Sequence, residues 1–198
     1  SHDIRTPLTL IAGSINKLFN RENMDATEQK YLKLIRTNTN RLLNLTGELL
    51  NFRKLETGNV TLRVSEENLV EFVQEIYISY TQFAINKHIE YKFEYSQPEI
   101  SVWIDKVQFE RAVCNLISNA FKYTPEKGEI SVKVNYANDG EATVSVTDTG
   151  EGIEAGEISH IFNRFYQVDK QAEGNGFGVG LAITREIVLS VSYTHLRA

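Results

Sequence analysis

The sequence predicts an α+β protein in which an N-terminal antiparallel helical hairpin precedes an α/β sandwich with a mixed sheet. Two observations lead to this expectation. Apolar residues in the first 57 positions recur every three or four residues, which is typical of amphipathic helices. After residue 60, short segments of alternating apolar and polar residues are separated by further helical patterns. The 198 residues suffice for one large or two small domains, and an apolar content of 41% allows a packed core.

The hairpin is predicted from two apolar stripes. The first stripe consists of Ile4, Leu8, Ile11, Ile15 and Leu18. After a polar break at residues 20–26, the second stripe consists of Tyr31, Ile35, Asn38, Leu42, Leu45, Leu49 and Phe52. Asn38 is polar, and such a residue in an apolar seam often fixes the register or oligomeric state of paired helices. Because two helices alone bury little surface, we expect residues 1–57 to pair with a second copy as a four-helix bundle.

Alternation and helix-end signals locate the elements of the second part. We expect strands at residues 60–64, 89–95, 100–104, 130–136 and 142–146, and helices at residues 66–86, 105–123 and 180–189. Asp105 suits the N-cap of the middle helix, because a carboxylate accepts a bond from a free amide of the first turn. Asn138-Asp139-Gly140 is typical of a tight hairpin turn. These signals predict a second domain at residues 60–189, with helices on one face of the sheet, and an atypical tail at residues 190–198.

Composition and charge exclude several classes of protein. A formal net charge of −5 disfavours nucleic-acid binding, which usually needs a basic surface. The single cysteine, Cys114, excludes an internal disulfide and a metal site made of several cysteines. No apolar run approaches the ~20 residues of a membrane-spanning helix, and no signal peptide is visible. We therefore expect a soluble chain from a reducing compartment.

His2 is followed by an acidic residue and, one helical turn later, by a helix breaker. Asp3 can hydrogen-bond the imidazole of His2 and raise the nucleophilicity of the other ring nitrogen. Pro7 interrupts a helical pattern, where it removes a backbone hydrogen bond and bends the helix. A lone exposed histidine usually has no chemical role, but these two neighbours favour one for His2.

Three polar residues share one face of the helix at residues 105–123. Asn115, Asn119 and Lys122 follow one another at spacings of four and three. The commoner interpretation of such a face is a solvated surface. The functional alternative is a site in which the amide oxygens bind a hard cation and the lysine binds phosphate. Mg²⁺ keeps several waters and needs few protein ligands, so one or two amides would suffice.

The sequence has two glycine-rich segments, one directly after a strand and one directly before the last helix. Asp148, Gly150 and Gly152 directly follow a strand, where they form either an ordinary turn or a surface that a flat ligand can approach. Alternating glycines at residues 174–180 precede the last helix, and a helix N-terminus is a natural phosphate site. The alternative is a mobile linker. This second segment lacks the Gly-Lys-Ser/Thr ending of a Walker A loop and the preceding strand of a Rossmann fingerprint.

An aromatic segment with one arginine lies between these glycines. We expect Phe162 and Phe165 to anchor a loop as core aromatics. Arg164 could reach a phosphate, because its guanidinium forms paired hydrogen bonds with phosphate oxygens.

Taken together and in this order, the segments resemble the sensor histidine kinases of two-component systems. Residues 2–8, His2-Asp3-Ile4-Arg5-Thr6-Pro7-Leu8, are similar to the phospho-acceptor box. Residues 115–123 resemble the asparagine box, 148–152 the first glycine box, 162–165 the phenylalanine box and 176–181 the second glycine box. The resemblance extends over residues 1–189. It implies a dimerisation and phosphotransfer domain at residues 1–57 and a catalytic ATP-binding domain of the Bergerat fold at residues 60–189.

The resemblance also implies how the chemistry is divided among the residues. His2 would attack the γ-phosphate of ATP, and Asp3 would be its orienting base. Asn119 would hold Mg²⁺, with Asn115 as a second contributor. The cation would position the phosphates and neutralise their charge, which phosphoryl transfer requires. Lys122 and Tyr123 would contact the nucleotide.

The glycine boxes would complete the nucleotide site. Asp148 would bind the adenine amine, while Gly150 and Gly152 would let the ring approach. The hinges of a lid over ATP would be Gly176, Gly178 and Gly180, and Leu181 ends the same box.

The expected partners follow from the same resemblance. A response regulator receiver domain would take the phosphoryl group on an aspartate, and Thr6 matches the position that can orient water for dephosphorylating it. A second copy of the chain would complete the hairpin. We expect the cytoplasmic portion of an inner-membrane sensor, joined to the membrane only through upstream segments. The family adds further strands after the helix at residues 180–189, so we expect a sheet truncated at its C-terminal end.

Two other functions compete with the kinase. A Bergerat ATPase that hydrolyses ATP to change conformation would share the sandwich, but such ATPases lack the hairpin and the His2 box. A non-catalytic dimerisation or nucleotide-binding module would share the hairpin, but the intact Asp148 and lid glycines count against it.

Overall fold

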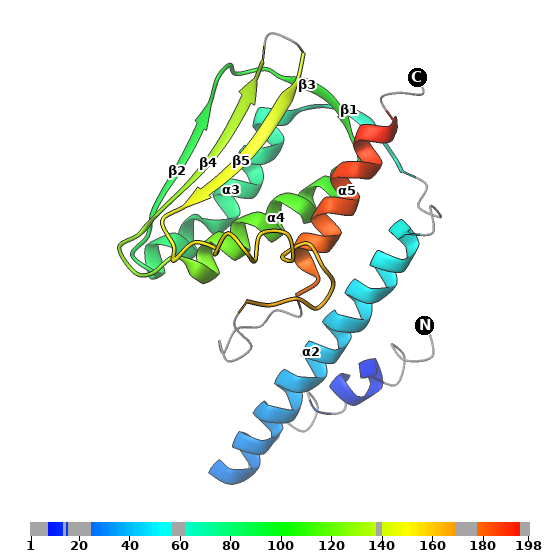
Figure 1. The fold of residues 1–198 in the computed structure, drawn as a ribbon. Helices are drawn as coiled ribbons and strands as arrows, with labels where there is room; N and C mark the ends of the chain where they lie inside the picture. The colour runs from blue at the N-terminus through cyan, green and yellow to red at the C-terminus, as the bar shows by residue number, and fades with distance from the viewer. Residues whose placement is uncertain are drawn as a thin grey trace. The chain divides into compact units, whose positions relative to one another are not determined.

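The computed structural model describes residues 8–13, 15, 25–56, 62–137, 140–168 and 178–194. The chain divides into two compact units, Ser1–Val60 and Thr61–Ala198. Figure 1 shows the first unit as helical and the second as a sheet with helices.

The first unit is built mainly from the long helix α2, Ala26–Glu56. Residues 8–13 and 15 are also helical. The start of α2 is closed by a reciprocal pair of bonds, in which Glu28 N donates to Asp25 Oδ1 at 2.7 Å and Asp25 N donates to Glu28 Oε2 at 3.0 Å. This capping box pairs backbone amides that have no partner within the helix, which explains why the helix begins at the polar break.

Three apolar residues of the stripe on α2 are exposed. Tyr31, Ile35 and Leu42 keep 60%, 46% and 48% of their surfaces accessible. The amide of Asn38, in the same stripe, donates to Leu34 O of its own helix at 2.9 Å. Among the described residues, Tyr31, Ile35 and Leu42 thus form apolar surface on α2 that is open to solvent.

The second unit alternates strands and helices. In chain order these elements are β1 Ser65–Asn68, α3 Leu69–Asn86, β2 Glu90–Tyr95, β3 Ser101–Ile104, α4 Lys106–Tyr123, β4 Glu129–Tyr136, β5 Ala142–Asp148 and α5 Gly180–Thr194. The main sheet has the order β2-β4-β5, with β2 parallel and β5 antiparallel to β4. β1 and β3 form a separate antiparallel pair. The predicted mixed sheet and α+β class are confirmed.

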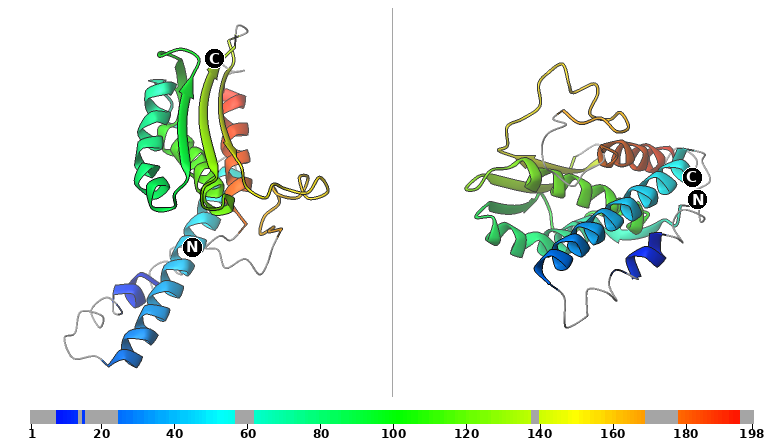
Figure 2. Two further views of the ribbon diagram at one scale, coloured as in Figure 1. Left: turned by 90° about the vertical axis from the view of Figure 1, so that its left-hand side faces the viewer. Right: turned by 90° about the horizontal axis from the view of Figure 1, so that it is seen from below.

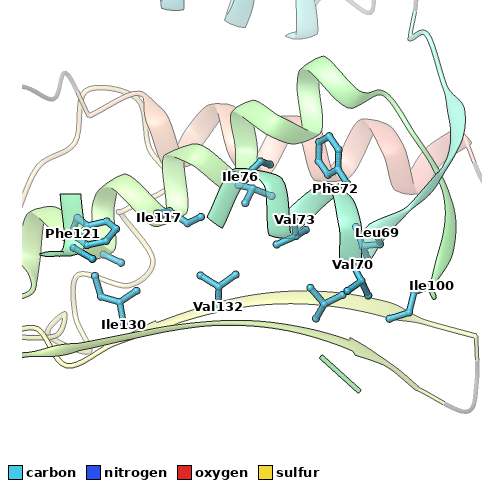
Figure 3. Packing of buried hydrophobic residues seen from close by; sticks show 14 of the residues in the cluster. Leu69, Val70, Phe72, Val73, Ile76, Ile100, Ile117, Phe121, Ile130 and Val132 are labelled. Carbon is cyan, nitrogen blue, oxygen red and sulfur yellow. The ribbon is translucent and has the colours of Figure 1, made fainter. Parts of the chain in front are cut away.

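One face of the main sheet forms the core with α3 and α4. Ile130, Val132 and Val134 alternate along β4 and are fully buried. Ile130 and Val132 face Val73 and Ile117 of the two helices, as the close view in Figure 3 shows. In the left view of Figure 2, α3 lies on one side of the strands. Burying such side chains stabilises the fold by about 1.5–3 kcal/mol each, so this layer is the main source of stability.

The opposite face of the sheet is polar. Lys92 forms ion pairs with Glu90 and Glu129, each at 3.0 Å, and Lys133 forms one with Glu94 at 3.4 Å. These pairs are well exposed, so each contributes little to stability. The alternation between a buried and a charged face fixes the register of the strands.

Some predicted boundaries were wrong. Residues 62–64 are not in a strand, and the strand β1 instead occupies Ser65–Asn68, where a helix was predicted from residue 66. Asn68 ends this strand and caps α3, since its side chain accepts a bond from Val70 N at 3.2 Å. The last helix, α5, extends to Thr194, five residues beyond its predicted end at residue 189. The hairpin turn keeps Gly140 at φ +89°, while residues 138 and 139 lie outside the described residues.

Candidate functional site

Helix α4 carries the polar face predicted as a site, and Asp105 fixes where this helix begins. One carboxylate oxygen of Asp105 accepts a bond from Gln108 N at 3.1 Å, as predicted for an N-cap. The other oxygen accepts a bond from Arg63 N at 2.8 Å. Asp105 is buried, and these two bonds compensate for the loss of water around its charge. The residue therefore joins α4 to the segment that leads into the second unit.

The structure directs Asn115 toward α5. Its Nδ2 donates to Gly180 O at 3.2 Å and to Thr184 Oγ1 at 3.4 Å. The Thr184 hydroxyl in turn donates to Gly180 O at 3.0 Å. Asn115 is thus held by the first turn of α5, and its Oδ1 is the atom left to accept from or coordinate a ligand.

Asn119 and Lys122 follow on the same helix. The Asn119 side chain is half-buried and has no hydrogen bond to another of the described residues. Lys122 is exposed, and its Nζ lies 3.0 Å from the hydroxyl of Tyr123 and 4.7 Å from the centroid of that ring. The predicted polar face is therefore present. The amide of Asn119 is available to a ligand, and Lys122 lies against the ring of Tyr123.

The end of β5 meets the end of α4. Asp148 is exposed, and its Oδ1 accepts a bond from Gly150 N at 2.8 Å. A Cβ on Gly150 would lie 2.7 Å from this oxygen and 2.7 Å from Tyr123 O. Gly150 is therefore required for packing within the protein. Gly152 differs, because it has φ +75° and no atom within 4 Å of its missing Cβ.

Gly128 belongs to the same region, although the sequence interpretation did not include it. A Cβ there would overlap Thr124 Cγ2 and lie 3.0 Å from Thr149 Oγ1. The Thr149 hydroxyl accepts a bond from Glu129 N at 2.8 Å, which fixes the turn after β5 to the start of β4. The turn residues Pro125-Glu126-Lys127 before Gly128 were the available signal for a close approach.

Gly178 is packed against the predicted phenylalanine box. Phe165 N donates to Gly178 O at 2.8 Å. Gly178 has φ +67°, and a Cβ there would overlap Tyr166 O and lie 2.8 Å from the carbonyl carbon of Phe165. We call these contacts of Gly178 with Phe165 and Tyr166 the 165–178 clasp. They join the two ends of the segment between positions 165 and 178.

The aromatic residues near this clasp do not lie in the core, contrary to the prediction. Phe162 and Phe165 are 39% and 55% exposed, and Phe165 has φ +61°. Arg164 is exposed between them. Gly180 and Leu181 form the first turn of α5 and are half-buried. His2, Asp3, Thr6 and Gly176 lie outside the described residues.

The single cysteine, Cys114, precedes Asn115 in α4 and lies beside Tyr80. Burial raises the pKa of the Cys114 thiol, so the thiol stays protonated at neutral pH. Burial also raises the pKa of the neighbouring Tyr80 to about 12. Neither group is therefore a nucleophile at neutral pH.

The described residues contain no group of three or more His, Cys, Asp or Glu side chains that could hold a metal ion. Among these same residues, no helix has the length and apolar character needed to cross a membrane.

Comparisons with known families agree with this arrangement. Residues 1–58 match the His Kinase A (phospho-acceptor) domain, and residues 104–196 match the histidine kinase-, DNA gyrase B- and HSP90-like ATPases. The chain belongs to the sensor histidine kinases. The resemblance predicted from the sequence is thereby confirmed.

Curated relatives of this sensor kinase chain are much longer. It is 38% identical over 192 residues to histidine kinase P4 of Formosa agariphila, covering 94% of this chain and 14% of that protein. It is 31% identical over 193 residues to the sensor histidine kinase WalK of Bacillus subtilis, covering 95% of this chain and 31% of that protein. The chain therefore spans less than a third of either relative.

Solved structures of histidine kinases share the fold. Full-length ShkA in complex with AMPPNP superposes with a TM-score of 0.84 at 26% identity, covering 96% of this chain and 40% of that one. The histidine kinase ThkA in complex with the response regulator protein TrrA gives a TM-score of 0.66 at 25% identity, covering 96% of this chain and 52% of that one.

Proposed function

We propose that the chain is the core of an ATP-dependent protein-histidine kinase, which phosphorylates His2 and passes the phosphoryl group to an aspartate of a response regulator. The observation that carries this proposal is the presence of both parts in one chain. A phospho-acceptor domain match includes His2, and an ATPase-like sandwich follows it. The complexes of ShkA with AMPPNP and of ThkA with a response regulator protein add support by similarity.

In the proposed reaction, a ring nitrogen of His2 forms a bond to the γ-phosphorus of ATP as the bond to the β-phosphate oxygen breaks. ADP leaves, and Asp3 orients the ring and takes up its proton. Mg²⁺ bound to the nucleotide would neutralise phosphate charge. Asn119 would hold the cation through its amide oxygen, with Asn115 Oδ1 as the second contributor. In a separate reaction, Thr6 would position a water that attacks the aspartyl phosphate of the response regulator, which releases inorganic phosphate and restores the aspartate.

The nucleotide would lie between the end of β5 and the start of α5. Asp148 has one oxygen engaged by Gly150 N, so its other oxygen is available to accept from the adenine amine. Lys122 and Tyr123 would contact the nucleotide, and Arg164 would contact its phosphates. Gly152 would admit the adenine ring alongside Gly150. The lid glycines would be Gly176, Gly178 and Gly180, and Leu181, at the end of the same box, would also contribute to nucleotide binding.

The domain roles and partners belong to the same proposal. Residues 1–57 would be the dimerisation and phosphotransfer domain, residues 60–189 the catalytic domain and residues 190–198 a tail. The half-exposed stripe of α2 supports a homodimer, because an apolar helix face of this kind needs a partner. The names of two relatives, a sensor histidine kinase and a respiration control sensor protein, support a role in sensing. The chain would further be the cytoplasmic part of an inner-membrane sensor.

The test is incubation of the purified chain with γ-labelled ATP and Mg²⁺. We expect acid-labile, base-stable label that disappears in His2→Gln. The matched control is His88→Gln, which replaces an exposed histidine paired with Glu126 at 3.2 Å and should retain the label. Label that survives His2→Gln would refute the proposal, and ATP hydrolysis without any label would favour the ATPase alternative.

A further inference from the structure

Thr184 is a buried polar residue in the first turns of α5, and the proposed mechanism gives it no role. Only 7% of its surface is exposed. Its hydroxyl lies 3.0 Å from Gly180 O and 3.4 Å from Asn115 Nδ2. The hydroxyl therefore connects α5 to the side chain of α4 that was predicted to contribute to the cation site.

The hydrogen-bond donors and acceptors at this contact determine the orientation of the Asn115 amide. The amide of Asn115 has two hydrogens, and Gly180 O and Thr184 Oγ1 provide two acceptors. The single hydrogen of Thr184 goes to Gly180 O, so its oxygen can only accept from Asn115. If the amide turned over, its oxygen would face the Gly180 carbonyl, which cannot donate. The bond to Gly180 O thus selects the orientation in which Asn115 Oδ1 remains available, and the Thr184 oxygen reinforces it because its own hydrogen is directed to Gly180 O.

We propose that Thr184 is a positioning residue, which holds the amide of Asn115 so that Oδ1 is kept for the nucleotide-bound cation. The inference rests on the proposed function, since it assumes that Mg²⁺ binds with the nucleotide at α4. It adds that the start of α5, next to the lid glycines, helps to set cation affinity. A change in the first turn of α5 would then be transmitted to the cation through one hydroxyl group.

The test compares Thr184→Val with Thr184→Ser. Valine keeps the shape of threonine but removes the hydroxyl, whereas serine keeps the hydroxyl. The matched control is Thr81→Val, because the Thr81 hydroxyl also bonds a carbonyl of its own helix, Ile78 O at 2.8 Å, but is exposed on α3. Nucleotide binding is measured with a fluorescent ADP analogue, both in EDTA and over a titration with Mg²⁺.

The loss of one neutral hydrogen bond should weaken the Mg²⁺-dependent part of binding about three- to tenfold in Thr184→Val. Binding in EDTA should stay unchanged, and Thr184→Ser and Thr81→Val should behave as the original chain. An equal loss of affinity with and without Mg²⁺ would overturn the inference, since it would indicate a purely structural role. An unchanged Mg²⁺ dependence in Thr184→Val would also overturn it.

A second measurement does not depend on the folding of a variant. In the original chain without metal, NMR should show the side-chain amide hydrogens of Asn115 protected from exchange with water. Rapid exchange, as for an exposed asparagine, would overturn the inference while leaving the kinase proposal intact. If the original chain binds nucleotide with no Mg²⁺ dependence at all, the cation site of the proposed function fails first and Thr184 loses its role with it.

Discussion

Gly150 and Gly152 allow a sharp test, because the same change to alanine should act through different physical causes at the two positions. At Gly150, the added Cβ would lie 2.7 Å from Tyr123 O and from Asp148 Oδ1. An ordinary nonbonded contact needs about 3.5 Å, so at least one of these oxygens must move. At Gly152 the space is open, and only the φ of +75° is unfavourable for alanine.

The magnitudes follow from these contacts. Overpacking at Gly150 costs about 1–3 kcal/mol, and losing the bond between Gly150 N and the exposed Asp148 adds about 1 kcal/mol. We therefore expect Gly150→Ala to lower the free energy of unfolding by about 2–4 kcal/mol. A left-handed alanine at position 152 costs about 1–2 kcal/mol and moves no neighbour.

The assay pairs thermal unfolding with binding of a fluorescent ATP analogue. Gly150→Ala should lower the Tm by about 5–15 °C and, because it displaces Asp148, weaken nucleotide binding about tenfold or more. Gly152→Ala should lower the Tm by only about 3–8 °C, with a smaller loss of affinity. The reasoning is refuted if Gly150→Ala leaves both quantities unchanged, or if Gly152→Ala is the more damaging change.

Two further changes test other contacts. Asp105→Ala should lower the free energy of unfolding by about 2–4 kcal/mol, because it removes the cap of α4 and leaves Arg63 N unpaired. Asp105→Asn keeps one of the two acceptor oxygens, so it should lower the free energy of unfolding by only about 1 kcal/mol. Urea denaturation measures both, and equal losses would contradict the double role of Asp105. Stability should also fall as pH rises from about 10 to about 12, because Tyr80 ionises near pH 10 when unfolded but near 12 when folded. Denaturation at several pH values should show a shallower fall in Tyr80→Phe, and an identical fall would count against this assignment.

Local signals predicted much of the second unit correctly. Asp105 caps α4, and this helix ends at Tyr123 before Thr124-Pro125, because capping and proline act on the nearest residues. The strand β2 and the pair β4 and β5 were also recognised, since one face of each is buried and the pattern repeats every second residue.

The errors arose where distant parts of the chain decide the structure. Residues Ser65–Asn68 contain two glutamates and read as the start of a helix, but they pair with Ser101–Ile104 to form a strand. Such a partner, more than thirty residues away, has no local signal. Phe162 and Phe165 were assigned to the core by residue type alone, which says nothing about the turn that exposes them.

In the candidate site, too, local patterns were predicted correctly and contacts between distant residues were not. The helical spacing of Asn115, Asn119 and Lys122 was readable from the sequence, as was the proximity of Asp148 to Gly150. The attachment of Asn115 to Thr184, 69 positions away, was not, because it depends on how α5 packs along α4. Gly128 was missed for a similar reason, since its neighbour Thr149 comes from another strand end.

The 165–178 clasp has a consequence for how this part of the protein can vary in length. With Phe165 N bonded to Gly178 O, the two ends of the intervening segment are fixed by the sandwich. The entropy of closing a loop grows slowly with its length, so doubling the segment would cost only about 0.6 kcal/mol. The stability of the fold should therefore depend less on the number of residues between the two ends than on Gly178, where any Cβ would overlap Tyr166 O.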